Sequence, residues 1–509
     1  MKSIGNIYVT DERDAEFEGK FGEFYRKRKA LADAGVHITP DRFDRTLSAE
    51  QLLAMKDTLV AAREAQTPLE SIHSSAGRIA NIREHKRSAF IDLMEQTGRV
   101  QVYVPHAQLS ADQSLIYKHL DRGDYLGVHG IPFATKTGEP TLHAQQLVLL
   151  GKTLRGFPEI GTPMDIENQY RERYLQLIID PKANERFRLR SKMLSSIRRF
   201  MDDSGFMEVE TPTIDALATG ALARPFSTHH NALDLDCQLR IAPEIALKKL
   251  VIGGFEKVYE IGKQFRNEGS SPEHMQEFTS MEFYWAYTNY ERLMEFTEEW
   301  FREVASRTKG KTQFDLEGQI IDLQGPWPRK TFRDLIEEFS GINIDAYPAQ
   351  DALEAACKQK THLDVSGKSN RGGTIDLMYK RLVRSKLMQP TFVLGHSADD
   401  SPLARRSDKN PTQVDRFQVV MGGTEIVNAY SELVDPIDQR IRFEEQARAK
   451  EGGDEEAHVI DHEYLRAMEL GMPPIAGWGV GIDRLMMLLS DMKNIRDVVL
   501  FPIMRPRQL

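Results

Sequence analysis

The chain has 509 residues, 40% of them hydrophobic and 8% aromatic, a length that predicts two or more domains because it exceeds what one core can organise. No apolar run reaches about 18 residues and the N-terminus turns acidic without an apolar signal core, so we expect no membrane partner and a cytoplasmic location. The two distant cysteines, Cys237 and Cys357, argue against a disulfide scaffold or a zinc site, and the net charge of −9 leaves any nucleic-acid contact to a local basic surface.

The first 168 residues separate into three regions. Residues 1–70 are predicted to form a helical segment, whose basic run Arg26–Lys29 is either a solvated helix face or an RNA contact. Residues 71–154 contain five short strands with glycine-containing turns, a pattern that predicts a small closed barrel of the OB type. Two prolines and two glycines fall within residues 155–165, so residues 155–168 are predicted to link two domains.

Residues 169–509 are predicted to form one large α+β unit. In chain order, we expect a helix over residues 186–204 capped by Gly205, a strand ending at Pro212, strands over 258–265 and 277–287, helices over 288–309 and 374–388, a glycine-broken pair of strands within 417–433, and a helix over 482–489.

The strand over residues 277–287 carries polar groups on one face. Side chains alternate between faces, so Phe278, Ser280, Glu282 and Tyr284 lie together, while Met281, Phe283 and Trp285 point to the core. A carboxylate between two aromatic rings is costly in a buried sheet unless a cation reaches it. Arg266, Glu268 and His274 lie just upstream, and this favours a functional site over a surface ion pair.

Three motifs occur together with this strand. They are GFMEVETP, which ends at Pro212, FRNEGSSPEHMQEFTSMEFY over Phe265–Tyr284, and GWGVGIDR over Gly477–Arg484. They resemble motifs 1, 2 and 3 of the class II aminoacyl-tRNA synthetases, and nearly the whole chain resembles the bacterial lysyl-tRNA synthetase family of subclass IIb. The resemblance implies ATP-dependent activation of L-lysine and its transfer to the 3′ end of tRNA(Lys). It also implies an antiparallel catalytic sheet flanked by helices, and a homodimer formed through the helix and strand before Pro212.

The resemblance assigns an ATP site with Mg²⁺. Arg266 would hold the α-phosphate and the substrate carboxylate, and Arg484 would clamp the γ-phosphate, so both are the expected catalytic residues. His274 would reach the terminal phosphates. The remaining ATP-binding residues are Glu268, Phe278 stacking on adenine, Glu425 as a Mg²⁺ ligand, and Gly481 leaving room for the nucleotide.

The resemblance also assigns a lysine pocket, formed by Gly220, Glu244, Glu282, Tyr284, Asn428, Tyr430, Glu432 and Gly479. A lysine side chain needs an apolar sleeve for its methylenes and carboxylates at its ammonium groups. Glu244, Glu282 and Glu432 are expected to be uncompensated in the empty pocket, so that they raise one another's pKa and favour a cation.

Three features of the sequence qualify these roles. Gln418 stands where the family has a second metal-binding glutamate, which predicts a weakened Mg²⁺ site. Trp478 replaces a small or aliphatic residue between the motif 3 glycines and is expected to repack the adenine edge. Glu425 has the opposite strand parity to Asn428 and Tyr430, so a bulge must intervene if it also faces ATP.

The barrel is expected to bind the anticodon. Arg78, Phe90, Gln101 and Glu139 match family positions with this role, and stacking a base on an exposed aromatic ring is how barrels commonly bind single-stranded RNA. The alternative for Phe90 is a place in the core.

Two other functions remain open from the residues alone. One is a paralogue that lysylates a protein or lipid, which the retained barrel disfavours. The other is a degenerate synthetase serving as an RNA-binding or regulatory module, which Gln418 supports slightly and intact Arg266 and Arg484 oppose. An aspartate- or asparagine-specific relative is disfavoured because an acidic pocket repels an acidic substrate.

Overall fold

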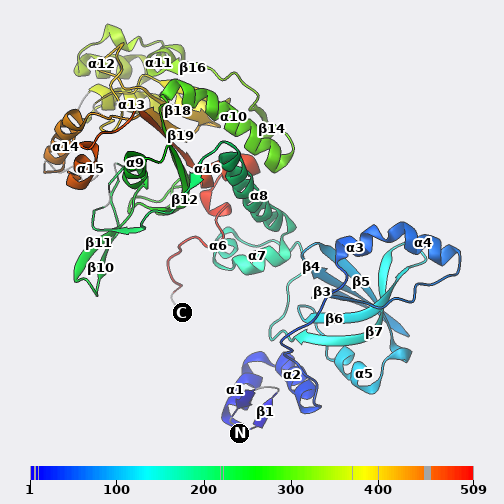
Figure 1. Cartoon of the computed structure of the whole chain (residues 1–509). Coiled ribbons are helices and arrows are strands. Elements are labelled where there is room, and N and C mark those ends of the chain that lie inside the picture. The colour runs from blue at the N-terminus through cyan, green and yellow to red at the C-terminus, as the bar shows by residue number, and fades with distance from the viewer. Residues whose placement is uncertain are drawn as a thin grey trace. The chain divides into compact units, whose positions relative to one another are not determined.

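The computed structural model describes residues 2–4, 7–9, 11–217, 219–221, 223–368, 371–398, 401–451 and 460–507. The chain divides into two compact units (Figure 1). One contains residues 1–163 with 178–180, and the other contains residues 164–177 with 181–509. Within the described residues, no helix combines the length and apolar character needed to cross a bilayer.

The start of the first unit is only partly helical. The strands β1 (Lys2–Ile4) and β2 (Ile7–Val9) form an antiparallel pair, so the expectation of helix alone over residues 1–70 is wrong there, and residues 1, 5, 6 and 10 lie outside the described residues. Isoleucine and valine at these positions suit a pleated strand. The helices that follow are α1 (Asp11–Phe21), α2 (Glu23–Asp33), α3 (Ala49–Ala54) and α4 (Lys56–Glu64).

The basic run on α2 contacts acidic side chains of its own unit. Nζ of Lys27 donates to Asp121 at 2.7 Å, and Lys29 forms an ion pair with Asp14. Arg26 also pairs with Glu18 at 3.6 Å, so at least three of the four basic side chains already have protein partners.

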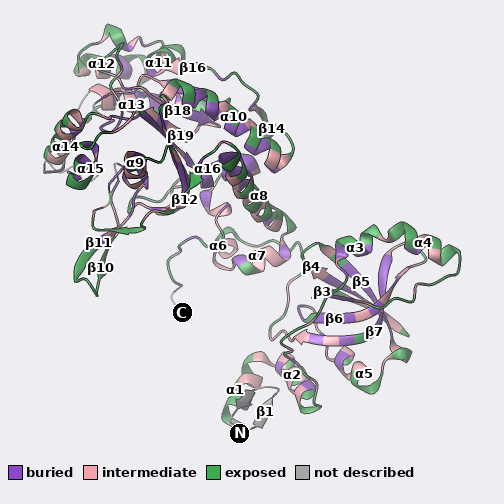
Figure 2. Cartoon of the chain, in the orientation of Figure 1, coloured by how far each residue is buried: buried purple, intermediate pink, exposed green. Residues whose placement is uncertain are grey.

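The strands of the first unit form a closed barrel, as the sequence predicts. They are β3 (His73–His85), β4 (Ser88–Glu95), β5 (Gly98–Pro105), β6 (Tyr125–Ala134) and β7 (Pro140–Gly151), joined in the order β3-β4-β5-β7-β6, with α5 (Ala111–Lys118) between β5 and β6. The barrel interior is apolar and sealed. Ile79, Ile91 and Val102 have no exposed surface, and Figure 2 shows the buried character of these strands.

The second unit is built on a mixed sheet. Among the described residues eight strands form it in the order β16-β17-β18-β19-β20-β13-β12-β8. The strands are β8 (Met207–Glu208), β12 (Lys257–Phe265), β13 (Glu277–Ala286), β16 (Arg329–Thr331), β17 (Thr391–Leu394), β18 (Arg416–Met421), β19 (Thr424–Ser431) and β20 (Ile475–Gly481). The five central pairings, from β17 to β12, are antiparallel, as expected, and the pairings at both ends are parallel.

The second unit also contains helices, several of which contact the sheet (Figure 1). They are α6 (Ile166–Arg171), α7 (Arg173–Ile179), α8 (Pro181–Asp203), α9 (Glu244–Ile252), α10 (Tyr290–Lys309), α11 (Phe332–Ser340), α12 (Gln350–Thr361), α13 (Arg371–Leu382), α14 (Pro436–Glu451), α15 (His462–Met468) and α16 (Ile482–Ser490). The main core packs α8 and α10 against one sheet face, through buried Phe200, Phe283 and Trp300. The other face is therefore left for a site.

A smaller sheet completes the second unit. It contains β9 (Ile214–Asp215), β10 (Ser227–His230) and β11 (Leu235–Leu239), and β14 (Gln313–Leu316) pairs separately with β15 (Gln319–Asp322). The β10–β11 hairpin projects from the unit (Figure 1), and every described residue of β10 is exposed.

Candidate active site

A cavity of about 1490 Å³ lies on the sheet face opposite α8 and α10. The sequence-predicted residues that line it are Gly220, Glu244, Arg266, Glu268, His274, Phe278, Glu282, Tyr284, Gln418, Glu425, Asn428, Tyr430, Gly479, Gly481 and Arg484. Glu432 is the predicted residue of this site that does not line it, because its side chain lies deeper, with 1% of its surface exposed.

Strand register brings the two main motifs together. Glu282 on β13 lies opposite Gly479 on β20, and Gly479 in turn lies opposite Asn428 on β19. Phe278, Glu282 and Tyr284 line the cavity whereas Met281 and Phe283 are fully buried behind it, so the predicted alternation of this strand is confirmed.

Gly477 is a site residue to which the sequence pattern gave no role. A Cβ at this position would overlap Oε1 of Glu432 and would also lie 2.5 Å from Cε1 of Tyr284. The glycine is therefore required by close packing against two predicted pocket residues. Gly477 lies two residues before Gly479 on β20 and therefore on the same face of the strand, and this spacing is the sequence feature that could have indicated its place in the site.

A β-bulge brings Glu425 to the cavity. Along β18 and β19, Val419 pairs with Val427 but the next residue, Val420, pairs with Glu425, so Ile426 is extra. Glu425 and Asn428 then both line the cavity although three positions separate them. The bulge that was required for Glu425 to share this face is confirmed.

The expectation for Trp478 is wrong. Its side chain is 2% exposed, stacks on Phe283 with ring centroids 5.0 Å apart, and donates from Nε1 to Oγ1 of Thr297 on α10 at 2.9 Å. Neighbouring residues of a strand point to opposite faces, so the glycines on either side of Trp478 face the cavity and the indole faces the helices. The indole therefore cannot repack the edge of a ligand in the cavity.

One end of the cavity is cationic. The guanidinium of Arg266 lies 5.2 Å from the ring centroid of Phe278, and its Nε donates to the carbonyl of Ile241 at 3.3 Å. Arg484 donates from Nη1 to the carbonyl of Glu425 at 3.0 Å. Glu268 is exposed at the rim. Two fixed guanidinium groups in one cavity suit an anion with several charged oxygens, such as a polyphosphate.

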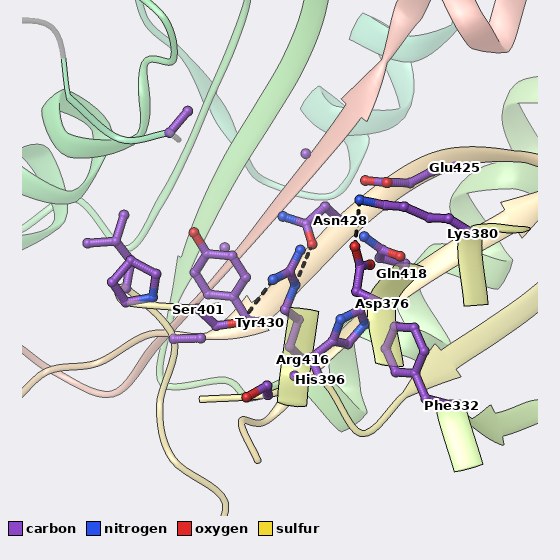
Figure 3. Close-up of a pocket in the computed structure, with 18 of the residues that line it drawn as sticks. Phe332, Asp376, Lys380, His396, Ser401, Arg416, Gln418, Glu425, Asn428 and Tyr430 are labelled. Atoms are coloured by element: carbon purple, nitrogen blue, oxygen red, sulfur yellow. Dashed lines mark hydrogen bonds and ion pairs between the residues drawn. The ribbon is translucent and has the colours of Figure 1, made fainter. Parts of the chain in front are cut away.

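The oxygen donors beside this end fit a magnesium ion held jointly with phosphates. Glu425 and Gln418 line the same cavity and both offer hard oxygen ligands, which Mg²⁺ prefers. Figure 3 shows Lys380 of α13 directed toward Glu425, and Lys380 pairs with Asp376 at 2.7 Å. No group of three or more His, Cys, Asp or Glu side chains placed to hold a metal occurs among the described residues, so any such ion needs further ligands, such as phosphate oxygens and water.

The other end of the cavity is acidic, but two of its carboxylates are compensated. Nζ of Lys248 on α9 donates to Oε1 of Glu244 at 2.5 Å and also pairs with Glu432. The expectation of three uncompensated carboxylates is therefore wrong, because Lys248 stands one helical turn after Glu244 and turns inward with it. The hydroxyl of Tyr430 donates to both oxygens of Glu244, at 2.8 and 2.9 Å.

Glu282 is the carboxylate of this end without an internal cation at contact distance among the described residues. The hydroxyl of Tyr284 donates to it at 3.3 Å. Burial and the nearby Glu244 raise the pKa of Glu282 to about 8, so its proton is retained near neutral pH. Asn428, on the far side of Gly479 from Glu282, accepts from Nε of Arg416 at 2.8 Å, as Figure 3 shows.

The predicted anticodon residues lie on the barrel of the first unit. Phe90 is half-buried and lies opposite Tyr103 on β5, with ring centroids 5.2 Å apart, whereas its neighbours Ala89 and Ile91 are fully buried. The alternative that Phe90 belongs to the core is wrong, because its ring points out of the barrel while the flanking side chains fill it.

The polar members of the same set are held by protein contacts. Gln101 accepts from Oγ1 of Thr141 at 2.9 Å, and Arg99 donates to Glu139 at 2.6 Å. The guanidinium of Arg78 lies 4.3 Å from the ring centroid of Tyr125. Aromatic rings and fixed polar groups are thus both present on this unit.

Two family models match the chain. The model of tRNA synthetases class II (D, K and N) matches residues 165–505, and that of the OB-fold nucleic acid binding domain matches residues 74–150. Curated relatives include lysine–tRNA ligases. That of Thermotoga sp. (strain RQ2) is 44% identical over 94% of both chains, and that of Moorella thermoacetica is 45% identical over 95% of this chain and 97% of its own. That of Syntrophomonas wolfei is 42% identical over 94% of this chain and 96% of its own.

Proposed function

The chain belongs to the class II tRNA synthetases of the D, K and N group, and we propose that it is a lysine–tRNA ligase, which activates L-lysine with ATP and transfers the lysyl group to the 3′ end of tRNA(Lys). The observation that carries this proposal is one cavity with a cationic end, around Arg266 and Arg484, and an acidic end, around Glu244 and Glu282. Such a cavity suits a nucleotide and a cationic amino acid held side by side.

The first chemical step joins the two substrates. The carboxylate of lysine attacks the α-phosphorus of ATP in line, the bond to the bridging oxygen breaks, and pyrophosphate leaves. The attacking carboxylate is already ionised, so no general base is needed. Arg266 at the α-phosphate and Arg484 at the γ-phosphate stabilise the charge of the transition state and hold the reacting atoms in line.

The remaining nucleotide contacts follow from the same placement. Phe278 stacks on adenine, His274 and Glu268 reach the nucleotide from the loop between β12 and β13, and Gly481 leaves its backbone open to the nucleotide. When bound, Mg²⁺ neutralises charge on the phosphate oxygens, and Glu425 and Gln418 are the residues that would hold it.

Lysine binds at the acidic end. Glu244 and Glu282 face its ammonium groups, Tyr284 and Tyr430 flank its methylenes, and Asn428 and Gly479 border the reacting carboxylate. Gly220 has φ of 93°, and a Cβ there would lie 3.1 Å from Cβ of Glu244, so only glycine suits this wall. Glu432 acts from behind the wall through Lys248.

The second step transfers the lysyl group. The terminal ribose hydroxyl of tRNA attacks the carbonyl carbon of lysyl-adenylate, and AMP leaves. The barrel binds the anticodon through Arg78, Phe90, Gln101 and Glu139, which agrees with the nucleic-acid-binding description of its family model. This surface favours tRNA over a protein or lipid acceptor.

We also propose a homodimer formed through α8 and the strand that leads to Pro212. Apolar side chains beside that proline are exposed in the single chain, with Met207 41% and Ile214 52% exposed. Burying them against a second copy would remove apolar surface from water. Sedimentation of the purified chain tests the dimer.

The proposed activity is tested by ATP–pyrophosphate exchange with each of the twenty amino acids, followed by charging of tRNA(Lys). Exchange should depend on lysine above all others. Preferential activation of another amino acid would overturn the assignment, and no exchange with any amino acid would favour a non-enzymatic role.

A further inference from the structure

The acidic end of the cavity contains a complete ammonium site that is already filled by the chain itself. Nζ of Lys248 contacts Glu244 at 2.5 Å and pairs with Glu432. Lys248 has no exposed surface, and Glu432 has 1%. No other cation pairs with either carboxylate among the described residues.

Aromatic rings complete the enclosure of this ammonium group. Nζ of Lys248 lies 5.8 Å from the ring centroids of Tyr284 and Tyr430, and 5.9 Å from that of Tyr464. Such ring faces attract a cation. Four of the residues proposed for the substrate, namely Glu244, Glu432, Tyr284 and Tyr430, therefore hold an internal lysine.

The buried pairs keep Lys248 charged. Burial alone opposes an ammonium group, but the carboxylates of Glu244 and Glu432 raise the pKa of Lys248 above its ordinary value. Removing one partner from such a group would leave an unpaired buried charge, which is strongly unfavourable. Glu244 and Glu432 are thus fixed in place by Lys248 before any ligand arrives.

Because Lys248 fixes Glu244 and Glu432, it determines which carboxylate remains to bind a substrate cation. Glu244 lines the cavity and Tyr430 holds its second oxygen, whereas Glu432 lies behind the wall made by Tyr284 and Gly477. Of the three carboxylates at this acidic end that the structure describes, Glu282 is then the one without an ion pair and can take up a new cation.

We propose that Lys248 is a positioning and specificity-determining residue, a built-in counter-ion that fixes Glu244 and Glu432 and limits the deep end of the pocket to one substrate ammonium group. The inference rests on the proposed function, because it concerns how the same pocket selects lysine. Without the internal ammonium, two buried carboxylates would repel each other, lose their orientation, and open a second cation site beside the substrate.

Kinetics of ATP–pyrophosphate exchange test the proposal. Lys248→Met keeps the bulk of the side chain and removes its charge, so the KM for lysine should rise by about 100-fold or more while the KM for ATP changes little. Lys249→Met is the matched control, since its neighbouring ammonium pairs at 3.5 Å with exposed Glu463 and lies outside the pocket. An unchanged KM for lysine in Lys248→Met would overturn the inference.

A charge-balanced double variant separates positioning from a simple loss of stability. The double variant Lys248→Met with Glu432→Gln removes one charge of each sign. Its KM for lysine should therefore be about tenfold or more lower than that of Lys248→Met alone. The inference fails if the increase in the KM for lysine in the double variant equals the product of the increases in Lys248→Met and in Glu432→Gln. The two residues would then act independently. The double variant leaves Glu244 without its ammonium partner but keeps the two hydrogen bonds from the Tyr430 hydroxyl to it, so it also serves if Lys248→Met does not fold.

Chemical rescue provides a second, independent measurement. Lys248→Ala leaves a cavity lined by carboxylates and aromatic rings, so millimolar methylammonium should lower its KM for lysine, and tetramethylammonium, which has no N–H donors, should not. Equal effects of both ions, or of neither, would contradict the assignment. Wild-type enzyme that fails to exchange with lysine would instead overturn the proposed function.

Discussion

Nη2 of Arg484 lies 2.8 Å from Nε2 of His274, a contact that joins the start of the last helix to the loop between β12 and β13. Because a guanidinium only donates, Nε2 must accept, and the ring proton lies on Nδ1, which is 2.8 Å from Oγ of Ser271. The imidazole is therefore neutral, and two groups proposed to bind phosphate are held together before a nucleotide arrives.

This contact predicts how His274 titrates. Burial and the charge of Arg484 hold the pKa of His274 below its ordinary value, so Arg484→Ala should raise that pKa toward the ordinary range. The ring resonances followed by NMR as a function of pH would measure it. Arg496→Ala is the control, since Arg496 is a cation that donates to the hydroxyl of Ser270 in the same loop and not to His274. A His274 titration that is unchanged in Arg484→Ala would contradict the prediction.

Arg266→Ala should slow lysyl-adenylate formation by at least about 100-fold, the effect expected for one preorganised donor at a developing charge. ATP–pyrophosphate exchange at saturating lysine measures it. Lys263→Ala on β12, the strand that ends just before Arg266, removes a half-exposed cation paired with Glu277 and should leave exchange near the wild-type rate. Near wild-type exchange in Arg266→Ala would end the assignment of this residue to the α-phosphate.

Lysine binding should release a proton from Glu282. Its pKa is raised to about 8, so at pH 7 the carboxyl is mostly protonated and must ionise to accept an ammonium group. Calorimetry in buffers of different ionisation enthalpy should find release of about one proton at pH 7 and less as the pH rises past 8. Glu282→Gln should abolish the release, and an unchanged release in that variant would assign the proton to another group.

The same shift predicts the stability of the empty protein. The pKa of a glutamate in the unfolded chain is about 4.3, so between about pH 4 and 8 the unfolded state loses a proton that the native state keeps. Glu282 therefore lowers the free energy of unfolding progressively as the pH rises through this window, with no further effect above it. Glu282→Gln should show a smaller decrease across that range in denaturant titrations, and equal slopes would refute the shift.

The double change Phe90→Ala and Gln101→Ala should raise the KM for tRNA by about tenfold or more, because stacking on one aromatic ring contributes about 1–3 kcal/mol per base. The KM for lysine in pyrophosphate exchange should stay the same. Lys118→Ala, at the exposed end of α5, is the control. Unaltered charging of tRNA by the double variant would mean that this surface has another role.

Gln418→Glu should lower the Mg²⁺ concentration needed for half-maximal exchange, since it adds a charged oxygen ligand beside Glu425. Glu425→Gln should raise it. A metal titration of nucleotide binding, followed by fluorescence of an ATP analogue, gives a readout that is independent of turnover. No change in Gln418→Glu would show that this position does not reach the ion.

Local patterns were enough to predict the cavity wall. The alternation of β13 and the parity of β19 depend only on the two-residue period of a strand, and so the sequence placed Glu282 and Tyr284 together and required the bulge before Asn428. The same rule, applied to Trp478, would have turned its indole to the helices. The expectation for Trp478 rested on the family resemblance, which does not indicate the face of the strand to which a substituted side chain points.

Contacts between distant segments were beyond such patterns. Lys248 pairs with Glu432, which is far along the chain, and nothing local to either residue indicates the other. The helix expected over residues 374–388 ends at Leu382, and a tighter turn follows, in which Lys386 donates to the carbonyl of Val383. Beyond this turn, the carbonyls of Leu387 and Met388 accept from the backbone of Gly423 and Gly422, and such tertiary hydrogen bonds are invisible in a single segment.

The bulge at Ile426 has a consequence for how the two ends of the cavity could change separately. Regular pairing of Ile426 with Val420 would move Glu425 on by one position and turn it to the opposite face of β19, while Asn428 and Tyr430 would keep their places against β20. One strand therefore carries two independently adjustable segments, joined at a single residue. Directed evolution of amino-acid preference could vary the segment after the bulge and leave the nucleotide contacts before it untouched.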